Sequence, residues 1–219
     1  MHSFFSGVKA VGFDLDRTLY IDTPEMGEKV AQEVFKAILK FKPDLKTIEK
    51  VGSIYKKKGE ELQSWLRVFK DIGMENCQET LHDCLEAANL TDLIEKDEKL
   101  VQIIEQLRQK FSLFLITRAK RDQALKKLTK IGIRPEIFHF SSFGNDGHSL
   151  SESYDKNFAH FLAQSPYQPS EHIYIGDNLR TDIMIPKNLG MKTILVGTCS
   201  KEADFSVSTI HEIAYLLLP

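Results

Sequence analysis

Two aspartates separated by one residue, Asp14 and Asp16, directly follow the apolar run VKAVGF at 8–13. In an extended strand end, residues two apart point to the same side, so the two carboxylates would face each other and repel. A divalent cation relieves this repulsion, and hard oxygen ligands of this kind suit Mg²⁺. The spacing therefore indicates a metal site with Thr18 as a supporting residue. A solvated acidic turn that caps a strand is the alternative interpretation.

A second acidic pair follows another apolar run, HIYIG at 172–176. Asp177 comes directly after this run, where it can reach the same metal, and Asp182 lies about a helical turn further on, where it can orient or supplement the metal ligands. Gly176 allows close approach of the backbone. A turn with a helix cap is again the alternative. Acidic residues after two strands of one predicted parallel sheet favour the metal site.

Three further residues could bind a phosphoryl group. Thr117 and Arg118 follow the apolar run FSLFLI at 111–116. At this place a hydroxyl, backbone N–H groups and a guanidinium could contact phosphate oxygens. Lys156 lies near the start of a predicted helix, where its ammonium could neutralise charge that develops on those oxygens. The alternatives are a helix cap for Thr117 and an ordinary surface lysine for Lys156.

Alternating strands and helices position these residues. Residues that follow Phe13, Ile116 and Ile175 lie where parallel sheets bind ligands, at the carboxyl ends of the strands. The alternation predicts a parallel α/β sheet. The strands are predicted at 8–13, 111–117, 137–140, 172–176 and 192–196, and the helices at 98–109, 121–131, 155–163, up to 189–190 and through 211–217, with a polar loop after 140.

The stretch between the first motif and about residue 93 has a different pattern. Thr23 as cap and Pro24 at the first helical position open a helix, and amphipathic segments follow at 48–58, 62–72 and 79–88. No segment of this stretch has the alternation of a strand. The sequence therefore predicts an all-helical insertion, with Trp65 and Phe69 in its core.

Composition limits the possible partners. The 29 Lys and Arg against 31 Asp and Glu give a net charge of -2, so no positive field attracts nucleic acid or an anionic membrane. The 3 cysteines follow no metal-ligand spacing and fit a reducing compartment. No apolar stretch is long enough to span a bilayer. We expect a soluble cytoplasmic protein that acts on a small molecule, with its oligomeric state open.

Four motifs, FDLDRTLY, LFLITR, Lys156 and IYIGDNLRTD, closely resemble in sequence and order the haloacid dehalogenase-like (HAD) phosphatase superfamily. The resemblance covers roughly residues 8–20 and 93–196. It implies a Rossmann-like catalytic core at 1–20 and 94–219, with a parallel sheet flanked by helices. The helical stretch at 21–93 resembles the cap that the family inserts after its first motif.

The resemblance also implies a role for each matching residue. Asp14 would attack phosphorus to form an aspartyl phosphate, and Asp16 would protonate the leaving oxygen and later deprotonate the hydrolytic water. Thr117 and Lys156 would hold the phosphoryl group. Asp14, the backbone carbonyl of Asp16, and Asp177 would bind Mg²⁺. The implied substrate is a small phosphorylated metabolite.

Several points stay open within the resemblance. Asp16 favours phosphoester chemistry, because family members that displace halide lack an acid at that position. Arg17, Arg118 and Asn157 depart from the family's usual residues, so the substrate preference does not transfer. A phosphomutase needs the same motifs, and a catalytically silent phospholigand-binding protein could keep the fold. Nucleotides, sugar phosphates and phosphoglycolate are all possible substrates.

Overall fold

The computed structural model describes residues 3–62, 64–144, 146 and 154–218. The chain divides into two compact units. The first unit comprises Met1–Ile21 together with Ile94–Pro219, and the second unit comprises Asp22–Leu93. Each unit has its own core and is described by itself.

A six-stranded parallel sheet forms the centre of the first unit, in the order β3-β2-β1-β4-β5-β6. Strand β1 lies between β2 and β4, and Phe13 at its end pairs with Leu115 and Ile175. This register brings the carboxyl ends of three strands to one edge of the sheet. The strands are β1 (Ala10–Phe13), β2 (Ser112–Ile116), β3 (Phe140–Ser142), β4 (His172–Gly176), β5 (Lys192–Val196) and β6 (Phe205–Val207).

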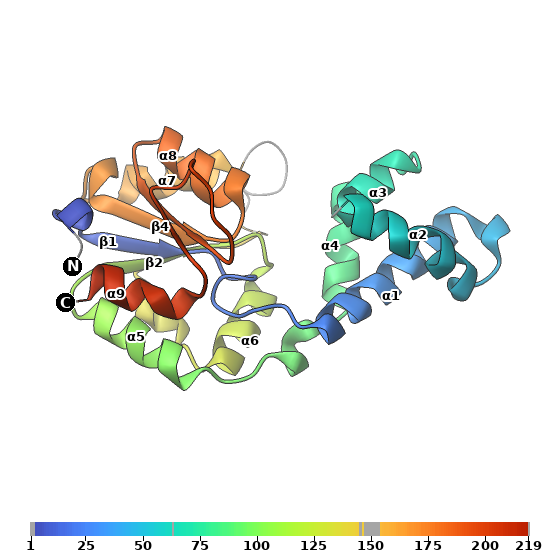
Figure 1. Cartoon of the computed structure of the whole chain (residues 1–219), viewed down its shortest axis with the longest axis horizontal. Helices are drawn as coiled ribbons and strands as arrows, with labels where there is room; N and C mark the ends of the chain where they lie inside the picture. The colour runs from blue at the N-terminus through green and yellow to red at the C-terminus, as the bar shows by residue number, and fades with distance from the viewer. Residues whose placement is uncertain (1–2, 63, 145, 147–153, 219) are drawn as a thin grey trace. The chain divides into compact units, whose positions relative to one another are not determined.

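Helices cover both faces of this sheet. Helices α7 and α8 lie on one face and α5, α6 and α9 on the other (Figure 1). Parallel strands need such crossover connections, and the result is a Rossmann-like α/β fold, as predicted. The helices are α5 (Glu98–Arg108), α6 (Arg121–Ile131), α7 (Asp155–Gln164), α8 (Ile185–Asn188) and α9 (Ile213–Leu217), with a π-helical segment at Leu179–Met184 and 3-10 turns at Ser3–Phe5, Pro135–Ile137, Pro169–Glu171 and Ile210–Glu212.

Aromatic packing fixes the centre of the sheet. Phe114 of β2 stacks on Phe161 of α7 with ring centroids 3.9 Å apart, and Phe158 meets the ring of Tyr174 edge to face at 4.6 Å. A Cβ at Gly12 of β1 would lie 2.1 Å from the Phe114 ring, so only glycine fits there. Helix α7 and strands β1, β2 and β4 are thereby held in one core.

The edges of the sheet differ from the sequence prediction. The strand predicted at 137–140 lies instead at Phe140–Ser142, because Pro135 begins a 3-10 turn that occupies the preceding residues. Strand β6 was not predicted, since three residues carry too short a pattern and depend on pairing with β5. Residues 145 and 147–153 of the predicted polar loop lie outside the described residues.

All of the regular secondary structure among the described residues of the second unit is helical. Thr23 caps its first helix, since its hydroxyl accepts a hydrogen bond from the Met26 backbone N–H at 3.3 Å, as predicted. The helices are α1 (Pro24–Phe41), α2 (Ile48–Leu62), α3 (Trp65–Asp71) and α4 (Cys77–Ala87), with 3-10 turns at Pro43–Leu45 and Leu90–Leu93.

An apolar cluster holds these four helices together. Phe69 is fully buried, and Trp65 packs edge to face against Phe35 with ring centroids 5.8 Å apart, which confirms the predicted core positions. Gly59 lies inside α2, where a Cβ would come within 2.5 Å of the Trp65 ring. The unit therefore has an independent hydrophobic core.

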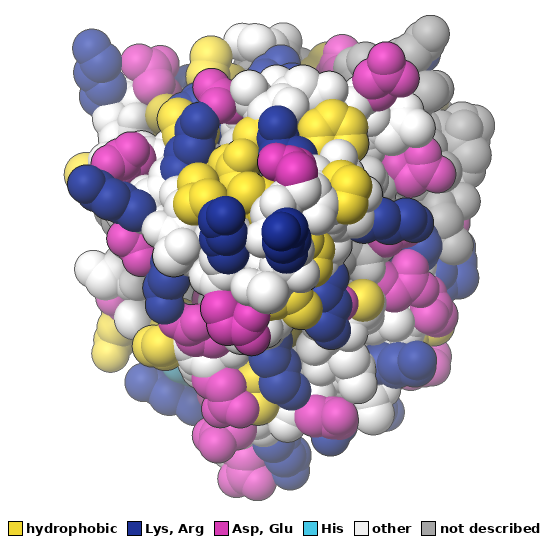
Figure 2. Space-filling view, turned by 90° about the vertical axis from the view of Figure 1, so that its right-hand side faces the viewer, with side chains coloured by type: hydrophobic (Ala, Val, Ile, Leu, Met, Phe, Trp, Pro, Cys, Tyr) yellow, Lys and Arg dark blue, Asp and Glu magenta, His cyan; other side chains and the backbone are white. Residues whose placement is uncertain are grey.

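Charged side chains of the second unit pair with one another at its surface. Lys56 binds Glu28 at 2.7 Å, and Lys58 binds Asp71. On the face drawn in Figure 2, Lys and Arg side chains are interspersed with Asp and Glu. Within the described part of the chain, no helix has both the length and the apolarity of a membrane span.

Candidate active site

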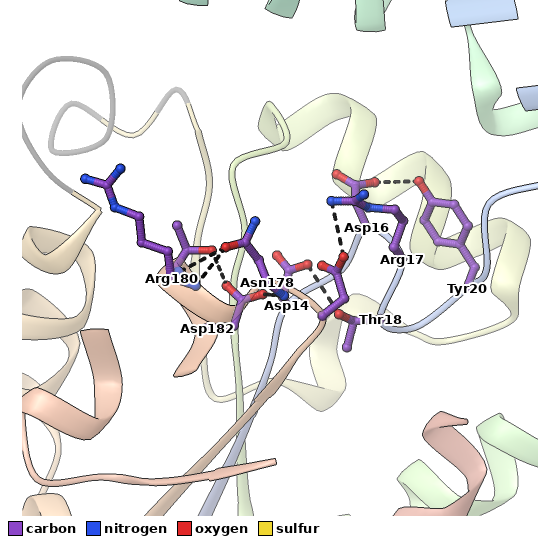
Figure 3. Close-up of polar contacts among 10 residues, drawn as sticks. Asp14, Asp16, Arg17, Thr18, Tyr20, Asn178, Arg180 and Asp182 are labelled. Carbon is purple, nitrogen blue, oxygen red and sulfur yellow. Dashed lines mark hydrogen bonds and ion pairs between the residues drawn. The ribbon is translucent and has the colours of Figure 1, made fainter. Parts of the chain in front are cut away.

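Three carboxylates converge at the carboxyl edge of the sheet. Asp14 follows β1, Asp177 follows β4, and Asp182 lies in the π-helical segment after β4. One oxygen from each of the three side chains lies within 4.8 Å of the others. Figure 3 shows Asp14 and Asp182 side by side at this edge. The pairing of β1 with β4 explains why acids 163 residues apart in the sequence meet here.

Burial disfavours the ionised form of the carboxyl groups in this cluster. Asp14 is 9% exposed and Asp182 only 2%. Burial raises the pKa of the Asp14 carboxyl well above its usual value, and the charges of Asp182, Asp16 and Asp177 raise it further. Burial also raises the pKa of Asp182 to about 6. The site thus holds carboxyl groups whose ionised forms need a compensating positive charge.

The Asp182 side chain is fixed by hydrogen bonds from both sides. Its Oδ2 accepts from the Asn178 backbone N–H at 2.9 Å, and its Oδ1 accepts from the Thr181 hydroxyl at 2.8 Å. Gly176 makes room for it, because a Cβ there would lie 2.4 Å from the Asp182 Cβ. The sequence predicts that Asp182 orients or supplements the metal ligands, and the structure places its carboxylate close to those of Asp14 and Asp177.

Two arginines line the same cavity as the acids. The Arg17 guanidinium lies 3.2 Å from Asp177 Oδ2, and the backbone of Arg17 is in the left-handed region at φ 60°. Arg118, which follows the end of β2, also faces this cavity. The lining residues are Asp14, Asp16, Arg17, Arg118, Asp177, Thr181 and Asp182. The cavity therefore combines a cation-binding acidic centre with groups that can contact an anion.

Asp16 has partners that sequence reasoning missed. Its Oδ1 accepts hydrogen bonds from the Lys127 ammonium and the Tyr20 hydroxyl, both at 2.5 Å. Tyr20 belongs to the first motif, four residues after Asp16, so a contact between the two could have been inferred from the sequence. Lys127 lies on α6, and nothing distinguishes it in the sequence from the other lysines. Thr18 donates a longer hydrogen bond, 3.5 Å, to Asp14 Oδ2.

Thr117 is buried at the end of β2, and its hydroxyl is used locally. Its Oγ1 accepts a hydrogen bond from the Ala119 backbone N–H at 3.2 Å, as in a turn. The preceding carbonyl, of Ile116, accepts from the hydroxyls of Tyr154 at 3.0 Å and Tyr174 at 2.6 Å. These bonds fix the end of β2 beside the cavity, but the cavity lining does not include Thr117.

Lys156 is exposed in the first turn of α7, and the described residues that line the cavity do not include it. Its neighbour Asn157 is 1% exposed, and neither polar atom of its amide has a hydrogen-bond partner among the described residues. The structure therefore brings together Asp14, Asp16, Asp177 and Asp182 with two arginines, and it leaves Lys156 outside that group.

The acidic cluster fits a hard divalent cation. All of its candidate ligand atoms are carboxylate oxygens, the ligand type that Mg²⁺ prefers. Buried carboxylates that oppose one another are stabilised when a cation lies between them. Asp14, Asp177 and Asp182 therefore have the chemistry and the proximity of a Mg²⁺ site.

Solved structures share the fold of this chain. A HAD phosphatase from Thermococcus onnurineus superposes with a TM-score of 0.66 at 19% identity over 96% of this chain and 98% of that one. YfnB from Bacillus subtilis, described as a HAD-hydrolase and bound to magnesium, has a TM-score of 0.65 at 16% identity, with coverage of 96% and 98%. A 2-haloacid dehalogenase from Pseudomonas syringae pv. Tomato DC3000 has a TM-score of 0.58 at 19% identity, with the same coverage.

At these identities the structural likeness establishes the fold, and it does not separate phosphatase from dehalogenase chemistry. No curated protein sequence matches the chain significantly. The sequence model of the haloacid dehalogenase-like hydrolases matches residues 11–196, from β1 to the end of β5. The chain therefore belongs to the haloacid dehalogenase-like hydrolase family.

Proposed function

We propose that this hydrolase is a Mg²⁺-dependent phosphatase that cleaves a small phosphomonoester through an aspartyl phosphate on Asp14. The observation that carries the proposal is the grouping of Asp14 with two further buried or half-buried acids, while Asp16 lines the same cavity. A nucleophilic carboxylate and a second carboxyl for proton transfer are the two groups that covalent phosphoester hydrolysis needs.

Asp14, the backbone carbonyl of Asp16, and Asp177 would hold Mg²⁺, with Asp182 orienting or supplementing these ligands. When bound, the ion would offset the negative charge of the carboxylates and of the phosphoryl oxygens. Arg118, which lines the cavity, would bind a phosphate oxygen. The proposal also assigns phosphoryl contacts to Thr117 and Lys156, on the resemblance of their motifs.

The reaction would proceed in two displacements at phosphorus. In the first, an Asp14 oxygen attacks phosphorus, the bond to the ester oxygen breaks, and Asp16 gives its proton to that oxygen. In the second, Asp16 takes a proton from water, the water oxygen attacks the aspartyl phosphate, and the Asp14 carboxylate and inorganic phosphate are released. Dividing the displacement in this way replaces one difficult step by two easier ones.

The place of Asp16 supports phosphoester rather than halide chemistry. A halide leaves without a proton, whereas an alkoxide leaves far more readily when an acid protonates it. Asp16 lies in the cavity two residues from Asp14, where it can serve this purpose.

The helical unit would act as the cap of the enzyme. A cap closes over a site to exclude water and to contact the rest of the substrate. Asp22–Leu93 form a compact helical unit after the first motif, which supports this assignment. The described cysteines, Cys77, Cys84 and Cys199, are free, and this supports a cytoplasmic enzyme that acts on a small phosphorylated metabolite.

Phosphate release from a panel of phosphomonoesters, including p-nitrophenyl phosphate, tests the proposal. The wild type should release phosphate with Mg²⁺ and stop when EDTA removes the metal. Asp14→Asn should lower kcat by roughly 10⁴-fold or more, since it removes the nucleophile. Asp122→Asn, at an exposed position in the first turn of α6, is the matched control and should keep full activity.

Two outcomes would contradict the proposal. If Asp14→Asn kept most of the activity, Asp14 would not be the nucleophile. An isomerised sugar phosphate without release of inorganic phosphate would instead indicate a phosphomutase, which passes the phosphoryl group to a substrate hydroxyl. A wild type that is inert with Mg²⁺ on the whole panel would indicate a phospholigand-binding protein.

A further inference from the structure

Two donors from separate parts of the first unit hold one oxygen of Asp16. The Lys127 ammonium, on α6, and the Tyr20 hydroxyl each lie 2.5 Å from Asp16 Oδ1. The Lys127 ammonium also lies over the Tyr20 ring, 5.7 Å from its centroid. Figure 3 shows the Asp16 carboxylate turned toward Tyr20. Each of the three side chains therefore contacts the other two.

Burial distinguishes this contact from an ordinary surface ion pair. The Lys127 side chain is 13% exposed and that of Asp16 38%, whereas in the neighbouring pair Arg17 is 51% exposed and Asp177 19%, so the difference lies in the buried cation. Exposed pairs hold their geometry weakly, because water competes for both partners. A largely buried ammonium has fewer alternative partners, and it keeps its acceptor in one place.

We propose that Lys127, assisted by Tyr20, is a positioning residue that fixes the Asp16 carboxylate through Oδ1 and leaves Oδ2 for proton transfer. Exchange of the two oxygens by rotation of the carboxylate would break both hydrogen bonds. Oδ2 would carry the proton, give it to the leaving ester oxygen, and take a proton from the hydrolytic water in the second displacement. This inference rests on the proposed phosphatase activity.

The physical reason is that proton transfer needs short contact. A general acid acts at about 2.6–3.2 Å from the oxygen that it protonates. A displacement of about 1 Å can cost roughly 10²-fold in rate. Lys127 and Tyr20 would therefore affect the reaction without touching the substrate, through the place of Asp16 alone.

Leaving-group dependence separates this role from general support of the fold. The first displacement sets kcat/KM, and it needs an acid for an alkyl phosphate much more than for p-nitrophenyl phosphate, whose leaving group is stable as an anion. Lys127→Met keeps the length of the side chain and removes the ammonium. We expect it to lower kcat/KM for the alkyl phosphate by about tenfold to 10²-fold, and to lower kcat/KM for p-nitrophenyl phosphate by less than about threefold, because that ester depends little on the acid.

Three further variants calibrate this result. Asp16→Asn, which removes the acid itself, should show the same difference between the two esters, with a larger loss of kcat/KM on the alkyl phosphate than Lys127→Met. Lys127→Arg should restore part of the loss on the alkyl phosphate, because a guanidinium can also donate to Oδ1. Lys126→Met removes the same charge from an exposed position on the same helix, and both substrates should be unaffected.

The outcomes that overturn the inference are distinct from those that overturn the enzyme assignment. Equal losses of kcat/KM on both substrates in Lys127→Met, or no loss on either, would give Lys127 no positioning role while the phosphatase assignment stands. A wild type that releases phosphate from neither ester overturns both. If thermal unfolding shows that Lys127→Met does not fold, Tyr20→Phe, which removes one hydroxyl, carries the same comparison between the two esters.

Discussion

The two units bury different kinds of side chain. The first unit buries carboxylates and other polar groups near the ends of its strands, including Asp14, Thr117 and Asp182. Among the described residues of the second unit, Thr91 is the one polar side chain that is buried. The ion pairs of the second unit, such as Lys56 with Glu28, lie at its surface.

This difference separates chemistry from packing. Buried like charges destabilise a fold unless a ligand compensates them, so they persist where binding requires them. An apolar cluster such as that around Phe69 stabilises its own unit without such a requirement. The first unit therefore shows which reaction is possible, and the second shows mainly how its four helices stay together.

The largest expected change in the free energy of unfolding comes from a substitution in the core of the second unit. Phe69→Ala removes a fully buried ring and should lower the free energy of unfolding by about 3–5 kcal/mol, measured by circular dichroism in urea. Mg²⁺ affinity, measured by calorimetry on folded protein, should not change, because the acidic cluster lies entirely in the first unit. A tenfold loss of Mg²⁺ affinity would show that the units are not separable in this way.

Asp14→Asn should have the opposite effect on stability. The raised pKa of Asp14 means that the folded state binds more protons than the unfolded state above the usual carboxyl pKa, so wild-type stability falls as pH rises through that range. The asparagine side chain of the variant would not titrate. Without metal, the variant should therefore unfold at a higher temperature than the wild type at pH 7.5, and the difference should shrink toward pH 4.

Mg²⁺ provides the control for this prediction. A saturating concentration stabilises the folded wild type by binding it, and it should stabilise Asp14→Asn much less. If the variant were less stable than the wild type at pH 7.5 without metal, the charge of Asp14 would be compensated within the protein, and the contrast between the two units would weaken.

Much of the fold and part of the site could be predicted from the sequence. The runs at 8–13 and 172–176 are apolar because both faces of a parallel sheet are covered, and they end in acids that the sheet brings together. Short edge strands were not predictable in the same way. Strand β6 has three residues, and its pairing with β5 defines it more than its own pattern.

Contacts between distant segments were the hardest to predict. Lys127 reaches Asp16 because α6 packs beside the end of β1, and no local spacing encodes that approach across 111 residues. The role of Lys156 stays a prediction, since its motif spacing suggested the site and the residues that line the cavity do not include it. Sequence patterns report which elements form, whereas side-chain contacts depend on how those elements pack.

Two glycines allow the two units to be compared by the same substitution, because each lies against a side chain typical of its unit. A Cβ at Gly176 would lie 2.4 Å from the Cβ of Asp182, and a Cβ at Gly59 would lie 2.5 Å from the Trp65 ring. Either change to alanine should cost about 1–3 kcal/mol of stability by overpacking. Gly176→Ala should also weaken Mg²⁺ binding, since it displaces a carboxylate of the acidic cluster.

Trp65 is the single tryptophan of the chain, so its fluorescence reports on the second unit alone. Gly59→Ala should shift the emission spectrum and leave the Mg²⁺ affinity unchanged. Gly176→Ala should lower the Mg²⁺ affinity and leave the emission spectrum unchanged. If both variants changed the emission and the affinity together, a perturbation in one unit would reach the other, and the two could not be treated separately.

The smallest expected effect concerns Arg17, whose guanidinium occupies the Asp177 carboxylate that would bind Mg²⁺. Because a cation must displace this contact, Arg17→Ala should tighten Mg²⁺ binding. The ion pair is half exposed, so the gain should be at most about 1 kcal/mol, or about fivefold in Kd. Calorimetry at low and high ionic strength measures it, and the gain should shrink as salt screens the pair.

Arg121 offers the matched control, since its guanidinium lies 3.3 Å from Asp146 and is 54% exposed, close to the exposure of Arg17. Arg121→Ala removes a similar ion pair away from the acidic cluster and should leave the Kd for Mg²⁺ unchanged. Weaker Mg²⁺ binding in Arg17→Ala alone would mean that Arg17 orients Asp177 for the metal instead of competing with it. The left-handed backbone of Arg17 would then serve to aim the guanidinium at a ligand, and the first unit would contain a positive group that its buried acids require.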